Sequence, residues 1–180
     1  MFKGFSIDKY KSMKPPANNS FQTMQEVKEI NSIPLDKAAV RKYDNIQKVF
    51  NDIAVKNKLK NFDLKLVDDL VRKSSPIIKK LKNHFNRPRP ISMAKNLNIS
   101  MDYYKMSSMN TPSYPSGHSV QGILIGRILS DKHPHLEKEF MNAGKKISYS
   151  RRIAKGHYKS DSKLGELMGE DMYKHIKNKI

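Results

Sequence analysis

The sequence has no cysteine and no long hydrophobic stretch. The absence of cysteine from its 180 residues excludes a disulfide scaffold, a thiolate metal site and a cysteine nucleophile. The longest clean apolar stretch runs only from about Val120 to Gly126, far short of the roughly 20 residues that a membrane-spanning helix needs. Chain length and composition instead favour one soluble globular domain that is large enough to have a core of its own.

The amino-terminal residues also lack an export signal. Met1 to Asp8 contain no apolar h-region and no small-residue cleavage site. We therefore expect a cytoplasmic protein. Residues 1–20 are expected to be poorly ordered, because Pro15-Pro16 and the short polar residues after them cannot continue a helix and offer little to bury. Residues 21–180 would then form a single helical domain.

Acidic residues are scarce. The chain has 17 Asp and Glu against 35 Lys and Arg, a formal net charge of +18. Such a charge attracts phosphates, nucleotides, nucleic acid or anionic membrane surfaces. An equally good explanation is composition, because abundant Lys, Asn and Ile are typical of an AT-rich genome. The few arginines are the more informative cations, since a guanidinium binds oxyanions through two parallel hydrogen bonds.

Hydrophobic periodicity predicts an all-α protein, a compact helical bundle. We expect helices over residues 21–30, 116–131, 136–152 and 158–177, and no segment alternates as a β-strand would. One further helix, with Asp36 as its N-cap, is predicted from an apolar stripe. The stripe comprises Ala39, Tyr43, Ile46, Phe50 and Ile53.

Proline marks two other regions. A stripe from Leu64 to Leu81 is interrupted by Pro76, which predicts a kink or two abutting helices. Residues 86–115 contain four prolines and form a long connection, a kind of segment that is usually functional or disordered. Within it, we expect the methionine-rich residues 91–112 to shape the mouth of a substrate site.

Three short motifs place chemically active residues where predicted helices end or begin. The first is Lys82, followed after six residues by Arg89-Pro90; the second is Pro115-Ser116-Gly117-His118; the third is Ser150-Arg151, followed after five residues by His157 and after three more by Asp161. Each motif alone has an ordinary explanation, as a solvated lysine, a helix exit, an N-cap serine or a polar i, i+4 pair.

Taken together, the motifs predict an oxyanion site beside two histidines. Lys82, Arg89 and Arg151 are cations that could converge on one oxyanion. The helix start at Ser116-Gly117 adds free backbone N–H groups and the positive end of a helix dipole. Glycine there also allows close approach of the backbone.

The two histidines of the motifs suit different steps of group transfer. His118, on the first turn of its helix, could donate a proton to a leaving oxygen. His157 and Asp161 are four residues apart and would share a helix face. Asp161 could accept the imidazole N–H and leave the other ring nitrogen free to attack. No set of residues has the spacing of a metal site.

In this order, the motifs resemble the signature of the type 2 phosphatidic acid phosphatase superfamily, which includes the bacterial class A non-specific acid phosphatases and the vanadium haloperoxidases. All eleven fixed positions of the signature are present. The chain is most similar to the class A acid phosphatases, from about Pro15 to Ile176. Ser113-Tyr114, Arg87, Gly156 and Ser160 also resemble that class.

The resemblance implies the all-helical fold of that superfamily and the following roles for eight residues of the motifs. His157 would form a phosphohistidine, His118 would protonate the leaving alcohol and later activate water, and Asp161 would orient His157. The phosphate oxygens would be bound by Lys82, Arg89, Ser116, Gly117 and Arg151. No metal or other cofactor is implied, and vanadate would act as an inhibitor that mimics phosphate.

The implied function is a metal-independent phosphomonoesterase, with phosphate transfer to alcohols as a possible second activity. Nucleotides, sugar phosphates and lipid phosphates are all candidate substrates, and an anionic membrane surface or a second copy of the chain are candidate partners. Two alternatives stay open: a vanadate-dependent haloperoxidase, and a catalytically silent protein that binds anions or nucleic acid. The chain lacks the basic-aromatic motif of a specific nucleic-acid reader. The missing export signal and Pro88 depart from the class A pattern.

Overall fold

The computed structural model describes residues 1–180 and contains helices but no strands, which confirms the all-α prediction. The α-helices are α1 (Asp8–Lys11), α2 (Phe21–Ser32), α3 (Lys37–Asp44), α4 (Ile46–Lys56), α5 (Leu64–Phe85), α6 (Pro90–Asn96), α7 (Gly117–Lys132), α8 (Glu137–Ile153) and α9 (Lys159–Ile176). Two 3-10 helices, η1 (Ser107–Asn110) and η2 (Pro134–Leu136), lie in the connections.

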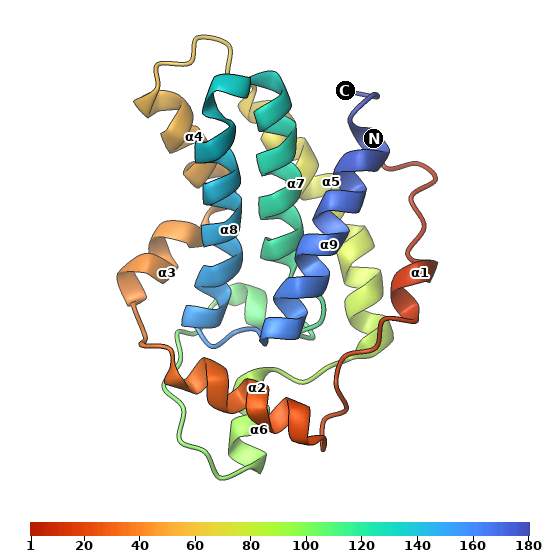
Figure 1. Ribbon diagram of the computed structural model, residues 1–180, viewed down its shortest axis with the longest axis vertical. Coiled ribbons are helices and arrows are strands. Elements are labelled where there is room, and N and C mark those ends of the chain that lie inside the picture. Colours follow the sequence, from red (N-terminus) through yellow and green to blue (C-terminus); the bar gives the residue numbers. More distant parts are fainter.

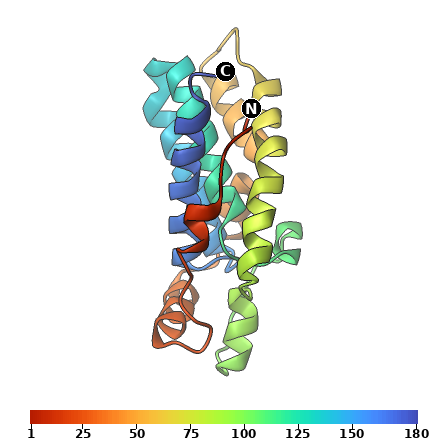
Figure 2. The same cartoon turned by 90° about the vertical axis from the view of Figure 1, so that its right-hand side faces the viewer.

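The long helices form a bundle in which α7 lies between α8 and α9, with α5 packed beside them (Figure 1). Helices α2 and α6 lie beyond one end of this bundle, and the side view shows both extending below it (Figure 2). α7 and α9 begin at that end, and α8 finishes there. The three predicted motifs are therefore brought to one end of the bundle.

The bundle core is apolar and very closely packed around α7. Leu124, Phe140, Ile147 and Met168 are fully buried members of its main cluster. Glycines at the helix crossings allow the neighbouring helices to lie close to α7. A Cβ on Gly165 would lie 2.6 Å from the Ser116 carbonyl oxygen, well inside van der Waals contact. Only glycine lets α9 approach the first turn of α7 this closely.

The stripe from Ala39 to Ile53 predicted one helix, but the structure has two. Asn45 separates α3 from α4 with an extended backbone (φ −90°, ψ 98°). Its side chain accepts a hydrogen bond from the Lys48 N–H at 2.8 Å and so caps α4. The periodicity is the same on both sides of the break, so it could not reveal an asparagine acting as an N-cap.

Pro76 lies inside one continuous helix, α5, so there are not two abutting helices. Proline at this position cannot donate to the Arg72 carbonyl one turn earlier, and side chains bind the carbonyl next to it. The Val71 carbonyl accepts hydrogen bonds from the Ser75 hydroxyl (2.7 Å) and from the Gln121 amide of α7 (3.1 Å). The proline-containing turn is thereby tied to the central helix.

The long connection is more regular than its prolines suggested. Pro90 is the first residue of α6, a position that tolerates proline because its N–H would have no helical partner. Met93 and Met101 are buried against α2 and Tyr158 rather than at a site mouth. Ser108 and Thr111 do line the cleft described below, so only part of residues 91–112 has the expected place.

The amino-terminal 20 residues, predicted to be poorly ordered, include α1 and pack on the bundle. Tyr10 is fully buried in the main core cluster, and its hydroxyl donates to Asp171 of α9 at 2.8 Å. α2 is anchored as well. The buried Lys155 ammonium donates to the carbonyls of Ile30 and Ile33 at the carboxyl end of α2, where a helix favours a cation.

Candidate active site

The nucleophile candidate His157 is held between a carboxylate and a guanidinium. Its Nδ1 lies 3.1 Å from Asp161 Oδ2, and its Nε2 lies 2.9 Å from Arg89 Nη1. Asp161 accepts the Nδ1 proton, and Arg89 can only donate, so the lone pair of Nε2 faces the arginine. Burial and then the charges of Arg89 and Lys82 hold the pKa of His157 well below its usual value. The ring is thus neutral, as a nucleophile must be.

Asp161 is itself fixed by residues that the three motifs do not contain. Its Oδ1 accepts from Arg87 Nη1 at 2.7 Å, and its Oδ2 accepts from the Tyr158 N–H at 3.0 Å. Burial raises the pKa of Asp161, while the charge and hydrogen bond of Arg87 oppose that rise. The Cζ atom of Arg87 also lies 3.8 Å from the centroid of the Tyr158 ring, a cation–π contact that stabilises the charged guanidinium. The orientation of His157 therefore depends on Arg87.

A carboxylate from α2 completes this network. Glu26 accepts from Arg87 Nη2 at 3.0 Å and from both the backbone N–H and the hydroxyl of Ser160, at 2.6 and 2.8 Å. Its side chain is only 9% exposed. Glu26 and Asp161 thus hold the two sides of one buried guanidinium, and α2 is coupled to the loop that carries His157.

The three predicted cations do converge at this end of the bundle, and all are buried. Lys82 donates to the Pro112 carbonyl at 2.6 Å. Arg89 donates to the carbonyls of Thr111, Gly156 and Ser108, each at 2.8 Å. These carbonyl bonds fix the cations in place. Burial and the Arg89 charge lower the pKa of Lys82 to about 7.

Arg151 has a different environment. Its side chain is fully buried, and its Nη1 donates to Asp44 Oδ1 at 2.7 Å. Its Nη2 has no hydrogen-bond partner within the protein. A buried guanidinium nitrogen without a partner is costly, which makes it an available donor for an oxyanion.

His118 lies on the first turn of α7, as predicted, and also contacts Asp44. Its Nε2 donates to the Asp44 carbonyl oxygen at 3.0 Å, which leaves Nδ1 for proton exchange. Burial and the Arg151 charge lower the pKa of His118 to about 4, while the hydrogen bond and charge of Asp44 act to raise it. A bound phosphate would add further negative charge and raise this pKa again.

Ser116 is the N-cap of α7, and Gly117 is its first residue. The Ser116 side chain is fully buried and accepts from the Ser119 N–H at 3.3 Å. Gly117, His118, Lys82 and His157 all line a cleft of about 260 Å³. Ser75, Ser108, Thr111 and Gln121 add polar lining. A cleft of this size suits a phosphate and a small attached group.

The structure brings the predicted site residues to one end of the bundle. Lys82, Gly117, His118 and His157 line the cleft, and Ser116, Arg89, Arg151 and Asp161 lie next to these residues without lining it. Sequence reasoning missed the roles of three other residues: Glu26, Asp44 and Arg87. Arg87 had a signal, since it stands two residues before Arg89 in the first motif. Glu26 and Asp44 had none, because each contact spans more than 60 residues of sequence.

Comparisons with known proteins show what the whole chain is similar to. A scan against models of known protein families gives no match. A non-specific acid phosphatase of Salmonella typhimurium is 28% identical over 130 residues, which are 57% of this chain and 52% of that protein. A non-specific acid phosphatase of Salmonella typhi is 35% identical over 57 residues, 32% of this chain and 23% of that protein. The chain thus matches about half, or less, of the length of these curated relatives.

The fold has a counterpart among solved structures. It is similar to the first transmembrane PAP2 type phosphatidylglycerolphosphate phosphatase from Bacillus subtilis, with a TM-score of 0.58, 17% identity, and coverage of 99% of this chain and 96% of that one. None of the helices described here has both the length and the apolar character that crossing a bilayer requires. The sequence is thus similar in part to non-specific acid phosphatases, and the fold is similar over its whole length to that of a PAP2 type phosphatase.

Proposed function

We propose that the protein is a metal-independent phosphomonoesterase that works through a phosphohistidine. The observation that carries this proposal is the neutral, buried His157, whose Nδ1 is held by Asp161 while its Nε2 faces Arg89. A neutral imidazole oriented by a carboxylate is an activated nucleophile. The curated relatives are named non-specific acid phosphatases, which supports the same reaction class.

The first step forms the covalent intermediate. A phosphate monoester enters the cleft, and Arg89 exchanges its contact with His157 Nε2 for one with a phosphate oxygen. The Nε2 lone pair then attacks phosphorus, the bond from phosphorus to the leaving oxygen breaks, and His118 transfers a proton to that oxygen. Asp161 stabilises the charge that develops on the His157 ring.

The second step reverses these roles. His118, now neutral, takes a proton from a water molecule, whose oxygen attacks phosphorus while the bond to His157 Nε2 breaks. Orthophosphate is released, and an alcohol in place of water would give a new phosphate ester. Lys82, Arg89, Arg151 and the N-terminus of α7 stabilise the equatorial oxygens in both steps, and losing one such donor costs about 10²–10³ in rate.

The substrate proposed for this cleft is a small or exposed phosphate monoester: a nucleotide, a sugar phosphate or the headgroup of a lipid phosphate. The volume of about 260 Å³ fits a phosphate with its first attached atoms, so the remainder of the substrate would stay outside. The polar lining of Ser75, Ser108 and Gln121 offers no dedicated site for a base or an acyl chain.

The test is hydrolysis of p-nitrophenyl phosphate from pH 4 to 8 in the presence of EDTA. We expect activity that survives EDTA, stops with vanadate and falls by at least about 10³-fold in His157→Ala. His135→Ala, which removes an exposed histidine, is the matched control and should be unaffected. Alkaline quench during turnover should trap a phosphorylated histidine in the peptide that contains His157.

Equal hydrolysis by wild type and His157→Ala would refute the nucleophile. Absence of hydrolysis in folded wild type would refute the phosphatase. Halide oxidation by the vanadate-loaded protein, or DNA binding with steep salt dependence that survives His157→Ala, would then support the haloperoxidase or the binding-protein alternative.

A further inference from the structure

Helix α5 forms one wall of the cleft at the candidate active site. Ser75, Ile78, Lys79 and Lys82 all line the cleft, and their spacing places them on one face of the helix. Lys82 is buried, and its ammonium is bound to the Pro112 carbonyl at 2.6 Å. Lys79, about one turn earlier, is exposed. It is therefore the cation of this wall that stands at the solvent side of the cleft.

Lys79 makes no hydrogen bond or ion pair within the protein, unlike three other cations of the same helix. Lys65, Arg72 and Lys73 lie 3.5, 2.6 and 3.3 Å from the carboxylate of Asp69. An unpaired ammonium at the edge of a cleft can bind an anionic ligand without giving up an existing contact. Lys79 is thus available to a ligand in a way that these other cations are not.

No carboxylate lines this cleft. The charged lining consists of Lys79 and Lys82, with no Asp or Glu. Two carboxylates lie next to the lining histidines, those of Asp44 and Asp161, but each is paired with a buried arginine at 2.7 Å. The positive charge of Lys79 is therefore not neutralised from within the cleft.

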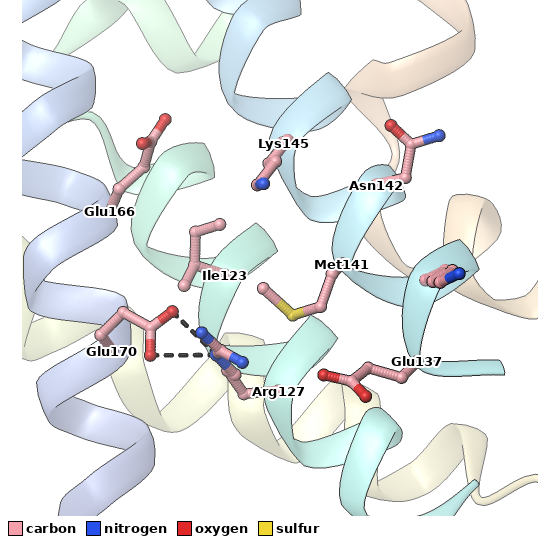
Figure 3. A pocket seen from close by; sticks show the side chains of 9 residues that line it. Ile123, Arg127, Glu137, Met141, Asn142, Lys145, Glu166 and Glu170 are labelled. Atoms are coloured by element: carbon pink, nitrogen blue, oxygen red, sulfur yellow. Dashed lines mark hydrogen bonds and ion pairs between the residues drawn. The ribbon is translucent and has the colours of Figure 1, made fainter. Parts of the chain in front are cut away.

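A second cleft shows that this excess of positive charge is local. It has a volume of about 600 Å³ and opens between α7, α8 and α9 (Figure 3). Arg127 pairs there with Glu170 at 2.8 and 3.0 Å. The charged lining of this second cleft consists of three carboxylates and three cations, namely Glu137, Glu166, Glu170, Arg127, Lys138 and Lys145. A cleft in this basic protein is thus not cationic merely because the chain is.

We propose that Lys79 is a specificity-determining residue that binds a second anionic group of the ligand, beside the phosphate at Lys82 and His157. Residues three apart on a helix have Cβ atoms about 5–6 Å apart. The two ammonium groups therefore suit two anionic groups that are a few bonds apart in one molecule. The second group is a carboxylate or another phosphate. This proposal rests on the proposed function, because it takes the cleft as the phosphate site.

The proposal divides phosphate monoesters into two classes. In one class the alcohol part carries its own negative charge close to the scissile phosphate, and Lys79 binds that charge. In the other class the alcohol part is neutral, and Lys79 has nothing to pair with. The cleft should therefore bind the first class more tightly.

The test uses three phosphonates, in which a carbon–phosphorus bond replaces the ester bond that a phosphatase cleaves. Methylphosphonate has one anionic group, phosphonoacetate adds a carboxylate, and methylenediphosphonate adds a second phosphonate. The Kd of each is measured by titration calorimetry at pH 6, below the pKa of Lys82. Wild type is compared with Lys79→Gln and with Lys80→Gln. Lys80 is the matched control, because it is an exposed lysine of the same helix that does not line the cleft.

We expect Lys79→Gln to raise the Kd of phosphonoacetate and methylenediphosphonate about two- to fivefold more than that of methylphosphonate, the range of an exposed ion pair. Lys80→Gln should change all three Kd values by one common factor. Lys79→Arg keeps the charge and should keep the preference. An effect confined to phosphonoacetate would identify the second group as a carboxylate, and one confined to methylenediphosphonate would identify it as a phosphate.

Equal factors for all three ligands in Lys79→Gln would overturn the proposal, because the lysine would then act on every anion alike. Failure of wild type to bind any of them would overturn it too. The two proposals fail separately. Hydrolysis of p-nitrophenyl phosphate together with equal factors would refute the role of Lys79 alone. Selective binding without hydrolysis would refute the phosphatase and leave the second anionic subsite in place.

Discussion

Truncation of Glu26 tests whether α2 is part of the catalytic scaffold. In Glu26→Ala, Arg87 keeps Asp161 on one side but loses its second carboxylate, and the Ser160 N–H loses its acceptor. The control on the same helix is Glu29→Ala. Glu29 pairs with Arg152 at 2.8 Å and with Lys159 at 3.2 Å, but its side chain is 39% exposed.

Burial sets the expected magnitudes. Removing one partner of a buried ion pair costs about 3–5 kcal/mol, whereas a surface pair contributes roughly 0–1 kcal/mol. For a chain of 180 residues, each kcal/mol shifts the Tm by about 2–4 °C. Glu26→Ala should therefore lower the Tm by roughly 6–20 °C, and Glu29→Ala by no more than about 4 °C.

Thermal melting followed by circular dichroism at pH 7 measures this difference, and hydrolysis assays well below each Tm measure its effect on the site. We expect Glu26→Ala to lose activity because Arg87 no longer holds Asp161 in place. Glu26→Gln keeps the side-chain shape and isolates the charge. Equal melting temperatures for Glu26→Ala and Glu29→Ala would refute the reasoning that the buried network stabilises the His157 loop.

Three further predictions concern other parts of the molecule. Asp44→Asn removes a charge that raises the pKa of His118. The loss of kcat with rising pH should therefore begin at a lower pH, and activity at neutral pH should be several-fold lower. An unchanged pH profile of kcat would contradict this. Raising the pH through about 7 neutralises Lys82, so the KM for a phosphate ester should rise above that pH, and Lys82→Met should abolish this rise. Gly144→Ala places a Cβ against the Gly122 carbonyl and should lower stability by about 2 kcal/mol, measured by urea denaturation.

The sequence was most informative about long helices and about the chemical identity of the site. The bounds of α7, α8 and α9 lie within about two residues of the prediction. α7 is buried on nearly every side, as a central helix must be. Breaks were harder to foresee. Asn45 ends one helix and begins another without any change in periodicity, and Pro76 lies inside one continuous helix.

The motifs predicted that residues far apart in sequence converge on one site, but individual side-chain contacts were predictable from spacing only between residues near one another in sequence. His157 and Asp161 could be paired from their spacing, although the predicted shared helix face is wrong: His157 lies just before α9, and Asp161 reaches it from the first turn of that helix. The contact of Glu26 with Arg87 and that of Asp44 with Arg151 could not, because tertiary packing alone brings those helices together. The hydrogen bond of Tyr10 with Asp171 likewise joins residues that are far apart in sequence, and local composition could not indicate it.

The unpartnered Nη2 of Arg151, together with the buried cations Lys82 and Arg89, has a consequence for turnover. Orthophosphate presents the same tetrahedral oxygens as the ester that produced it, so cleavage removes the alcohol but none of the strongest contacts. If the protein is the phosphatase proposed above, we expect product release to be slow relative to chemistry and accumulating phosphate to compete with fresh substrate. An enzyme built in this way slows its own reaction as phosphate builds up, and works fastest where phosphate is continually removed.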